Sequence, residues 1–442
     1  MTELASNQFA LLGTRRFLPL FLVQFLGAFN DQVYQKAFVA LITYRLADQV
    51  GIPIAMLGII ASALFILPFA LITPMAGQIA DRMDKAVMMR WIKAWEIVVM
   101  GLAVVGYYTQ NIVFLYFVLF LMGAQSAMFA PIKYSVLPQY LRREELMAGN
   151  GLVQGFTFLA IIFGTIIGNE LILREGGVLI VSVFVVSVAV IGFISSLYTP
   201  SAPAQQNAEP VDWFFIRAIW KLIAMCRKNR PAWRAILAIS WFWFLGATFL
   251  SLLPSYAKEE LGVDEGVLTV LLAGFSIGVA IGAIASDRLS GGRVGPHLPP
   301  WGALGLAIMA VELWMATPPA PAPGAELLTR AEFFSDIAGW RVLIDFVVLA
   351  AFAGIYVTPM NAILQTESPD DKRASFIAAS NVVDSSLIVL NAVVVAVLVA
   401  IGLDTRSVLV VITLTGLPMA FLVARFAPET LLGRLALSIW PR

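Results

Sequence analysis

The sequence has 442 residues, enough chain for two or three soluble domains. Its composition excludes such an arrangement, because 60% of the residues are apolar and only 13% are charged, whereas soluble domains have about 45–50% and about 25%. The 29 Lys and Arg residues against 28 Asp and Glu residues leave a net charge of +1, which excludes bulk charge as a basis for binding nucleic acid. With a mean hydropathy of +0.86, most of the chain is expected to lie in a lipid bilayer.

Residue types that carry chemistry are scarce. Cys226 and His297 are the single cysteine and the single histidine, which excludes a disulfide framework and a Cys- or His-rich metal site. The sequence contains no phosphate-binding Gly-x4-Gly-Lys-Ser/Thr loop and no His-x4-Asp acyltransferase motif. We therefore expect no catalytic residue, no metal site and no cofactor, and the protein is predicted not to be an enzyme.

Apolar runs long enough to cross a bilayer, about 20 residues each, recur along the whole chain. They cover residues 17–45, 53–80, 87–108, 112–132, 146–172, 178–198, 233–256, 266–286, 298–317, 341–364, 375–401 and 407–426. The sequence therefore predicts an all-α membrane protein with twelve transmembrane helices.

The basic residues test that count, because Lys and Arg accumulate in cytoplasmic loops. With a cytoplasmic N-terminus, 22 of the 29 Lys and Arg residues fall on the cytoplasmic side and six on the outer side, and Lys36 lies within a span. A missed span would invert every later loop and destroy this bias. Both termini are thus predicted to be cytoplasmic.

The spans divide into two groups of six. The predicted parts are a first six-helix half at 1–198, a linker at 199–232, a second six-helix half at 233–426 and a cytoplasmic tail at 427–442. The linker mixes aromatic and basic residues, which is typical of an amphipathic helix on a membrane surface. A short surface helix is also expected in the tail.

Short motifs recur in both halves, as expected for a duplicated transporter. The turn after the second span carries Asp81, Arg82 and Lys85, and the turn after the eighth carries Asp287 and Arg288. An aspartate at a helix end can accept hydrogen bonds from the N-terminus of another helix. These five residues are candidate gating residues; the alternative is a solvated turn.

Polar residues in the first span are the main candidate site. Asp31 lies near the middle of that span, where inserting a carboxylate costs about 2.5–3.5 kcal/mol. We expect this polar lining to hold a substrate head group, with Asp31 holding an ammonium group and Lys36 or another base holding a phosphate. The alternative is a structural cluster bonded to neighbouring helices. The candidate substrate-binding residues of this span are Gln24, Asn30, Asp31, Tyr34 and Lys36.

The second half differs in composition. Its first span carries Trp241–Phe244 and no charge to match Asp31, while Asn381 and Asp384 share one face of the eleventh span and complete the candidate binding residues. One polar half and one apolar half suit an amphiphilic substrate. The alternative is that the aromatic residues face lipid or pack the core.

Residues 17–34, within the first span, resemble the opening segment of the bacterial lysophospholipid transporter family, a branch of the major facilitator superfamily. The similarity continues at Ala80–Arg82, Phe129–Tyr134, Asn150–Gly151 and Thr358–Asn361. Where relatives carry Phe-Asn-Asp-Asn, this chain has Phe-Asn-Asp-Gln at 29–32, a conservative change.

The resemblance implies a major facilitator fold and a multi-pass protein of the bacterial inner membrane. It also implies a secondary transporter that flips lysophospholipids, such as lysophosphatidylethanolamine and lysophosphatidylglycerol, from the outer to the inner leaflet. A separate acyltransferase would then restore the second chain. Membrane lipids and this acyltransferase are the expected partners.

Three alternatives stay open at this point. A proton-coupled exporter of small amphiphilic compounds would use Asp31 as its proton carrier and would fail without a proton gradient. A membrane lipid enzyme would produce a product of altered mass. A passive scramblase would lack head-group preference.

Overall fold

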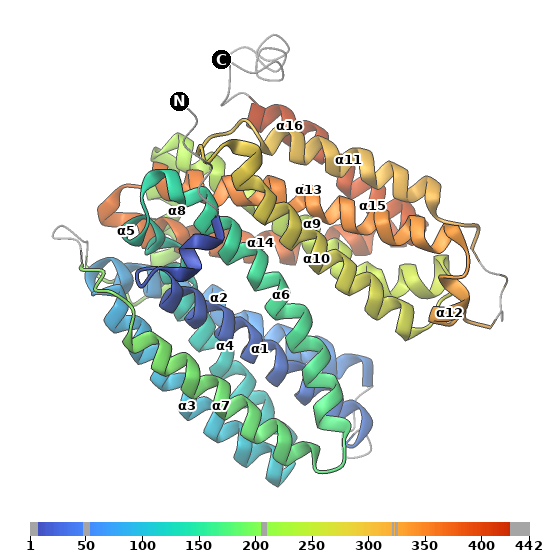
Figure 1. Ribbon diagram of the computed structural model, residues 1–442, viewed down its shortest axis with the longest axis horizontal. Coiled ribbons are helices and arrows are strands. Elements are labelled where there is room, and N and C mark those ends of the chain that lie inside the picture. Colours follow the sequence, from blue (N-terminus) through green and yellow to red (C-terminus); the bar gives the residue numbers. More distant parts are fainter. Residues whose placement is uncertain (1–7, 47–53, 205–209, 321, 323–325, 425–442) are drawn as a thin grey trace. The chain divides into compact units, whose positions relative to one another are not determined.

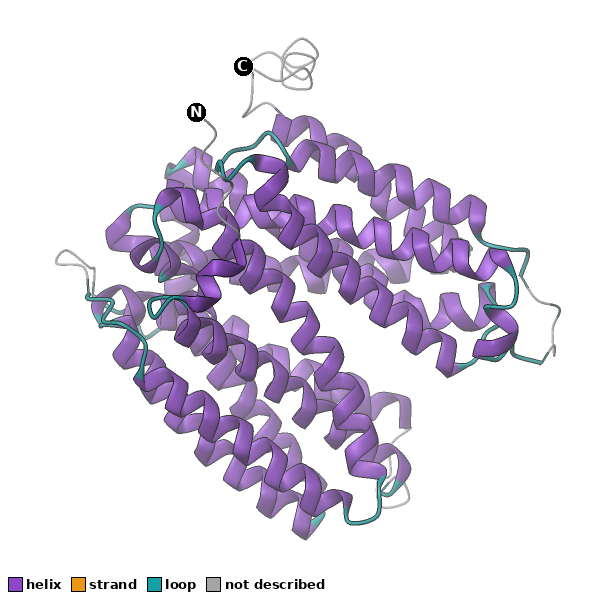
Figure 2. Ribbon diagram, viewed as in Figure 1, coloured by secondary structure: helices purple, strands orange, loops and turns teal. Residues whose placement is uncertain are grey.

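Helices lie at each of the expected spans in the computed structural model, which describes residues 8–46, 54–204, 210–320, 322 and 326–424 (Figures 1 and 2). The all-α prediction is confirmed; within the described residues, the extended structure is limited to one isolated bridge between Val263 and Leu328. The predicted tail 427–442 lies outside the described residues. The last predicted span differs from expectation, because it forms two helices that meet at Thr415.

The helices form two units. The first unit contains the described residues up to Arg143, together with Leu159–Trp233 and Leu364–Ser385. The second contains Glu144–Phe158, Arg234–Ile363 and the described residues from Ser386 onward. Four long helices therefore contain residues of both units. The predicted division of the chain into two six-helix halves stays a prediction.

The first unit is built largely from the first half of the chain. Its helices are η1 (Gln8–Gly13), α1 (Leu18–Tyr44), α2 (Ile54–Arg82), α3 (Lys85–Thr109), α4 (Ile112–Ser135), α5 (Leu137–Tyr140), α7 (Gly177–Leu197), α8 (Phe215–Lys228) and η5 (Asp370–Lys372). It shares with the second unit η3 (Arg143–Glu145), α6 (Leu146–Leu173), α9 (Arg230–Ser255), the last turn of α13 (Ile337–Glu367) and α14 (Arg373–Ala400). Within it, α2 packs on α4, and α3 and α1 pack on α7.

The second unit takes most of the remaining helices. They are the π-helical turn Tyr256–Glu260, α10 (Glu265–Ser290), α11 (Pro299–Ala316), α12 (Arg330–Phe333), α13 (Ile337–Glu367), α15 (Thr405–Leu414) and α16 (Gly416–Ala424). Within it, α11 packs on α15 and α16.

Small residues allow several of these helices to approach closely. A Cβ atom added at Gly168 of α6 would lie 2.5 Å from the Val33 carbonyl oxygen of α1. At Gly282 of α10, an added Cβ would lie 1.9 Å from the Ala351 carbonyl oxygen of α13. Larger side chains at these positions would separate the helices.

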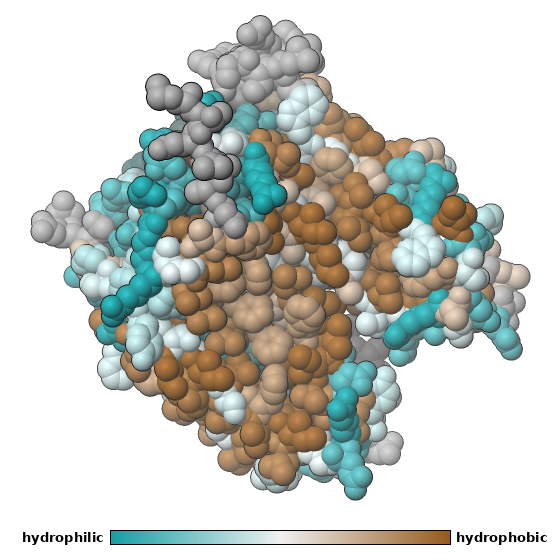
Figure 3. All heavy atoms as spheres, in the orientation of Figure 1, coloured by the Kyte–Doolittle hydropathy of each residue, from teal (hydrophilic) through white to brown (hydrophobic). Residues whose placement is uncertain are grey.

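Ten of the described helical segments are long and apolar enough to cross a membrane. Helices α1 and α3, of 27 and 25 residues, are not among them, and each carries ionised residue types along its length. Apolar side chains cover the long sides of the helices on the face shown in Figure 3, as lipid contact requires. The number of crossings and the side of the termini stay predictions.

The linker contains the expected helix, α8, held against the first unit. Its buried face, Ala218, Leu222 and Cys226, has a spacing of four residues, and α8 packs on α2. Asp212, just before α8, accepts hydrogen bonds from Arg217 and forms an ion pair with Lys221. These cations hold the pKa of the Asp212 carboxyl well below its usual range. Contact with a membrane surface stays a prediction.

Candidate functional site

Asp31 lies on α1 with its side chain buried in the first unit. The Ser126 hydroxyl of α4 donates to Asp31 Oδ2 at 2.5 Å, while Asp31 Oδ1 is buried without a hydrogen-bond partner among the described residues. Lys133, two turns further along α4, interacts electrostatically with Asp31. This part of the unit therefore contains a carboxylate on α1 and an ammonium group on α4 that interact with each other.

Asn30, the neighbour of Asp31, belongs to a second group of polar side chains centred on Glu96 of α3. Asn30 Nδ2 donates to Glu96 Oε1 at 3.0 Å, and Gln125 Nε2 donates to Glu96 Oε2 at 3.0 Å. Lys93 Nζ lies 2.6 Å from the same Oε2 atom. Every one of these groups is buried, so each needs the partners that it has.

The ammonium group of Lys93 lies close to Gly27 of α1 and to the ring of Phe129. A Cβ atom added at Gly27 would lie 2.6 Å from Lys93 Nζ, so the ammonium group would have to shift if this residue carried a side chain. The Phe129 ring centroid lies 5.6 Å from the same nitrogen, within the range of a cation–π contact. Lys93 and Glu96 are three residues apart on α3, so this ion pair forms within one helix.

Ser126 connects the two polar groups. Its hydroxyl oxygen lies 2.5 Å from Asp31 Oδ2 and 3.0 Å from Gln125 Oε1. A serine hydroxyl has one hydrogen to donate and two lone pairs that accept. It can satisfy both neighbours at once only when a protonated Asp31 donates to it. The chain Asp31–Ser126–Gln125–Glu96 is therefore sensitive to one proton.

The other candidates of the first span form no hydrogen bond with this network in the described residues. The Tyr34 hydroxyl donates to the Leu115 carbonyl oxygen at 2.9 Å, which ties α1 to α4. Gln24 is buried on the same helix. Lys36 is partly buried and has no hydrogen-bond or ion-pair partner within the described parts of the chain. The role of all three in binding stays a prediction.

The candidates of the second half also belong to the first unit. Asn381 and Asp384 lie on the part of α14 that this unit contains, and Asp384 is buried. Asp384 interacts electrostatically with Tyr134, the residue that follows Lys133 on α4. The structure thus brings the best candidates of both halves to α4.

The candidate gating residues fall into two classes. Asp81 is buried at the end of α2, where its two carboxylate oxygens accept from the backbone nitrogens of Ala374 and Ser375, each at 2.9 Å. These nitrogens belong to the first turn of α14, whose donors lack partners within the helix. Lys85 is buried, and its backbone nitrogen donates to the Ala202 carbonyl oxygen at 2.9 Å.

Arg82 and Arg288 are exposed, and Asp287 is partly buried at the end of α10. Within the described residues, the Asp287 side chain makes no hydrogen bond to the start of another helix. A gating role for these five residues stays a prediction.

Sequence reasoning missed the two α4 residues that contact Asp31. Ser126 gives no signal, because a single serine in an apolar span usually bonds to its own helix. Lys133 lies in the segment Phe129–Tyr134 that carries part of the family resemblance, so its charge was visible in the sequence. Its proximity to Asp31 depends on how α1 and α4 are rotated.

The comparison with family models matches residues 20–390 to the Major Facilitator Superfamily model. The chain belongs to the major facilitator superfamily. The curated relatives include lysophospholipid transporters LplT. That of Serratia proteamaculans (strain 568) is 26% identical over 384 residues, 85% of this chain and 87% of the relative. That of Klebsiella pneumoniae (strain 342) is 25% identical over 442 residues, 97% and 96% of the two chains.

Solved structures of the superfamily show the same fold. A bacterial homologue of the iron transporter ferroportin in an outward-facing state matches with a TM-score of 0.70 and 14% identity, covering 94% of this chain and all of that chain. The human organic anion transporter MFSD10 matches with a TM-score of 0.71 and 12% identity, covering 92% and 99%.

The resemblance seen in the first span is confirmed by these relatives, and so is the major facilitator fold. The superfamily consists of transporters rather than enzymes, and this chain is accordingly a multi-pass membrane transporter.

Proposed function

We propose that this protein is a secondary transporter that moves lysophospholipids from the outer to the inner leaflet of the bacterial inner membrane. Lysophosphatidylethanolamine and lysophosphatidylglycerol are the proposed substrates, and a separate acyltransferase re-acylates the product. The proposal draws on relatives named as lysophospholipid transporters over most of the chain.

The observation that carries the proposal is the buried carboxylate of Asp31, which interacts electrostatically with Lys133. One oxygen of the Asp31 carboxylate is left without a partner among the described residues, and Lys133 is close enough to interact with it. An ethanolamine phosphate head group carries an ammonium and a phosphate close together. In this proposal Asp31 holds the ammonium and Lys133 holds the phosphate through charge-assisted hydrogen bonds.

The second unit supports a substrate with an apolar part. Trp241 and Phe242 lie on α9, the first long helix of the second half, and both are buried in this unit. Trp241 Nε1 donates to Thr415 Oγ1 at 2.9 Å, so even its polar atom is used internally. A sugar or small ion would need polar contacts that this helix lacks.

The test is uptake of labelled lysophosphatidylethanolamine into proteoliposomes. We expect Asp31→Asn and Lys133→Gln each to reduce uptake about tenfold or more, since a charge-assisted hydrogen bond contributes about 1.5–3 kcal/mol. Asp345→Asn is a matched control, because Asp345 is also a buried carboxyl on a long helix but lies in the second unit. Full uptake by folded Asp31→Asn protein would remove Asp31 from the site.

A second candidate function is a proton-coupled exporter of amphiphilic compounds. The hydroxyl of Ser126, which lies between two acceptors, favours it because one extra proton on Asp31 would complete the network. An uncoupler distinguishes the two candidates. Lysophospholipid uptake that is unchanged by the uncoupler supports the flippase, and loss of transport supports proton coupling.

A further inference from the structure

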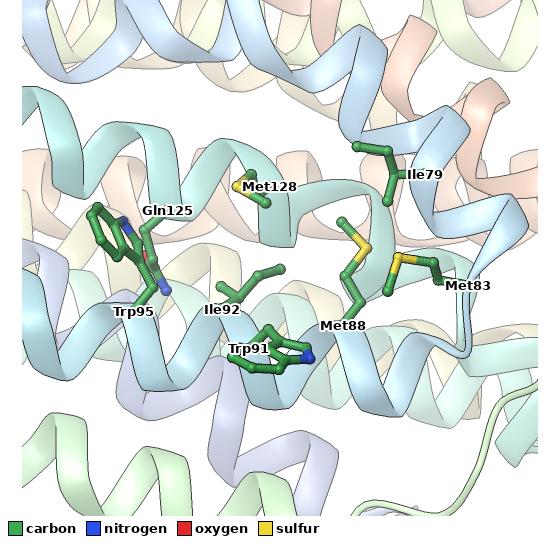
Figure 4. A pocket seen from close by; sticks show the side chains of 8 residues that line it. All are labelled: Ile79, Met83, Met88, Trp91, Ile92, Trp95, Gln125 and Met128. Carbon is green, nitrogen blue, oxygen red and sulfur yellow. The ribbon is translucent and has the colours of Figure 1, made fainter. Parts of the chain in front are cut away.

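A cavity of about 340 Å³ lies in the first unit between α2, α3 and α4 (Figure 4). Ile79 contributes from α2, Met83 contributes from the residue directly after the end of α2, and Met128 contributes from α4. The volume is at the lower end of the range for pockets that hold small molecules, about 300–1,000 Å³. The cavity is thus large enough to hold part of an organic ligand.

Helix α3 supplies the side of the cavity that opens outward. Met88, Trp91, Ile92 and Trp95 follow one face of this helix at spacings of three and four residues (Figure 4). Trp91 is 70% exposed and Trp95 is 42% exposed, whereas Ile92 is buried. A ligand therefore enters from the outer surface of the unit, where lipid surrounds a membrane protein.

The chemistry of the lining selects an apolar ligand. Gln125 is the one polar residue among those that line the cavity in the described chain, and it is buried. Its amide nitrogen donates to Glu96 and its amide oxygen lies 3.0 Å from the Ser126 hydroxyl, so both ends are already used. The methionine side chains are flexible and adapt to a chain of variable shape.

A cation lies beside the cavity. Arg82 is three residues after Ile79 on the same face of α2 and next to Met83. It is exposed and has no hydrogen-bond or ion-pair partner in the described parts of the chain. The positive-inside prediction places this end of α2 at the cytoplasmic surface, where the phosphate groups of membrane lipids lie.

We infer that this cavity binds one acyl chain of a phospholipid of the cytoplasmic leaflet, with the phosphate of that lipid at Arg82. The bound lipid is a resident of the membrane and not the transported substrate. Gln125 lies between the cavity and the polar network at Asp31, and the other lining residues take no part in that network. The inference holds whether or not the substrate is a lysophospholipid.

Photolabelling of the full chain in liposomes tests the inference. The probe is phosphatidylglycerol with a diazirine at the end of one acyl chain, and labelled peptides are mapped by mass spectrometry. We expect labelling of the peptides containing Met88–Trp95 and Met128 to exceed that of the exposed face of α7 by about threefold or more. Equal labelling of the two surfaces would overturn the inference.

Two variants separate a cavity from ordinary lipid contact. Met128→Trp fills the cavity and should abolish the excess labelling. Ile191→Trp adds the same side chain to the exposed face of α7, where Ile191 is 52% exposed, and should leave the excess unchanged. Persistence of the excess in folded Met128→Trp protein would contradict an acyl-chain site.

The phosphate contact is tested with a fatty alcohol that carries the same diazirine but no phosphate. Wild-type protein should be labelled at the cavity at least twofold more by the phospholipid than by the alcohol, and Arg82→Gln should remove that difference. Equal labelling by both probes in the wild type would remove Arg82 from the site. None of these measurements depends on transport, so failure of the proposed function would not alter them.

Discussion

The end of α2 in the first unit and the end of α10 in the second carry the same Asp-Arg motif but contact their neighbours differently. Asp81 accepts from two backbone nitrogens at the start of α14. Asp287 makes no such contact within the described residues, although α10 also approaches another helix closely. Within the described residues, the Asp-Arg motif therefore forms hydrogen bonds to another helix in the first unit but not in the second.

Close packing is what the two regions share. In the first unit, a Cβ atom at Gly77 would lie 2.8 Å from the Ala374 carbonyl oxygen of α14. In the second, a Cβ atom at Gly151 of α6 would lie 2.6 Å from the Ala283 carbonyl oxygen of α10. Backbone contact through glycine thus brings the helices together in both units, and in the first unit the aspartate adds hydrogen bonds.

Enlarging the two glycines should have the largest effect. We expect Gly77→Leu and Gly151→Leu each to destabilise the helix contact by about 1–3 kcal/mol, because the backbones would have to separate. The measurement is thermal unfolding together with uptake into proteoliposomes. Gly101→Leu is the matched control, since nothing lies within 4 Å of a Cβ atom at Gly101. An effect at only one of the two glycines would break the similarity between the regions.

Removing the carboxylate of Asp81 should have the next largest effect. Asp81→Asn keeps the shape but leaves one carbonyl oxygen for two backbone donors, so the contact with α14 should weaken by about 1–2 kcal/mol. We expect uptake to change about tenfold or more. An increase would show that the contact holds a state that transports slowly, and a decrease would show that transport requires the contact. Unchanged uptake and unchanged thermal stability would exclude Asp81 from gating.

The same substitution at Asp287 should have the smallest effect. Its side chain makes no hydrogen bond to another helix in the described chain, so Asp287→Asn should alter uptake less than twofold and stability by about 0.5 kcal/mol or less. The same two measurements apply. An effect as large as that at Asp81 would show that the two regions work alike.

The site could be predicted in part. Asp31 was identified because a carboxylate within an apolar span has few reasons to be there other than a partner or a cavity. Ser126 and Lys133 were not chosen, because partners on another helix depend on the rotation and crossing of both helices. Tyr34 shares a helix with Asp31, yet its hydroxyl is used to bond α4.

By itself, the sequence determined the helical architecture and where each helix lies, because a segment in lipid must satisfy its backbone hydrogen bonds internally. Only the tertiary structure decided which polar groups meet: Asp31 with Ser126, Glu96 with Asn30 and Gln125, and Asp81 with the start of α14. Hydropathy depends on each residue alone, whereas a hydrogen bond between helices depends on the relative placement of two helices.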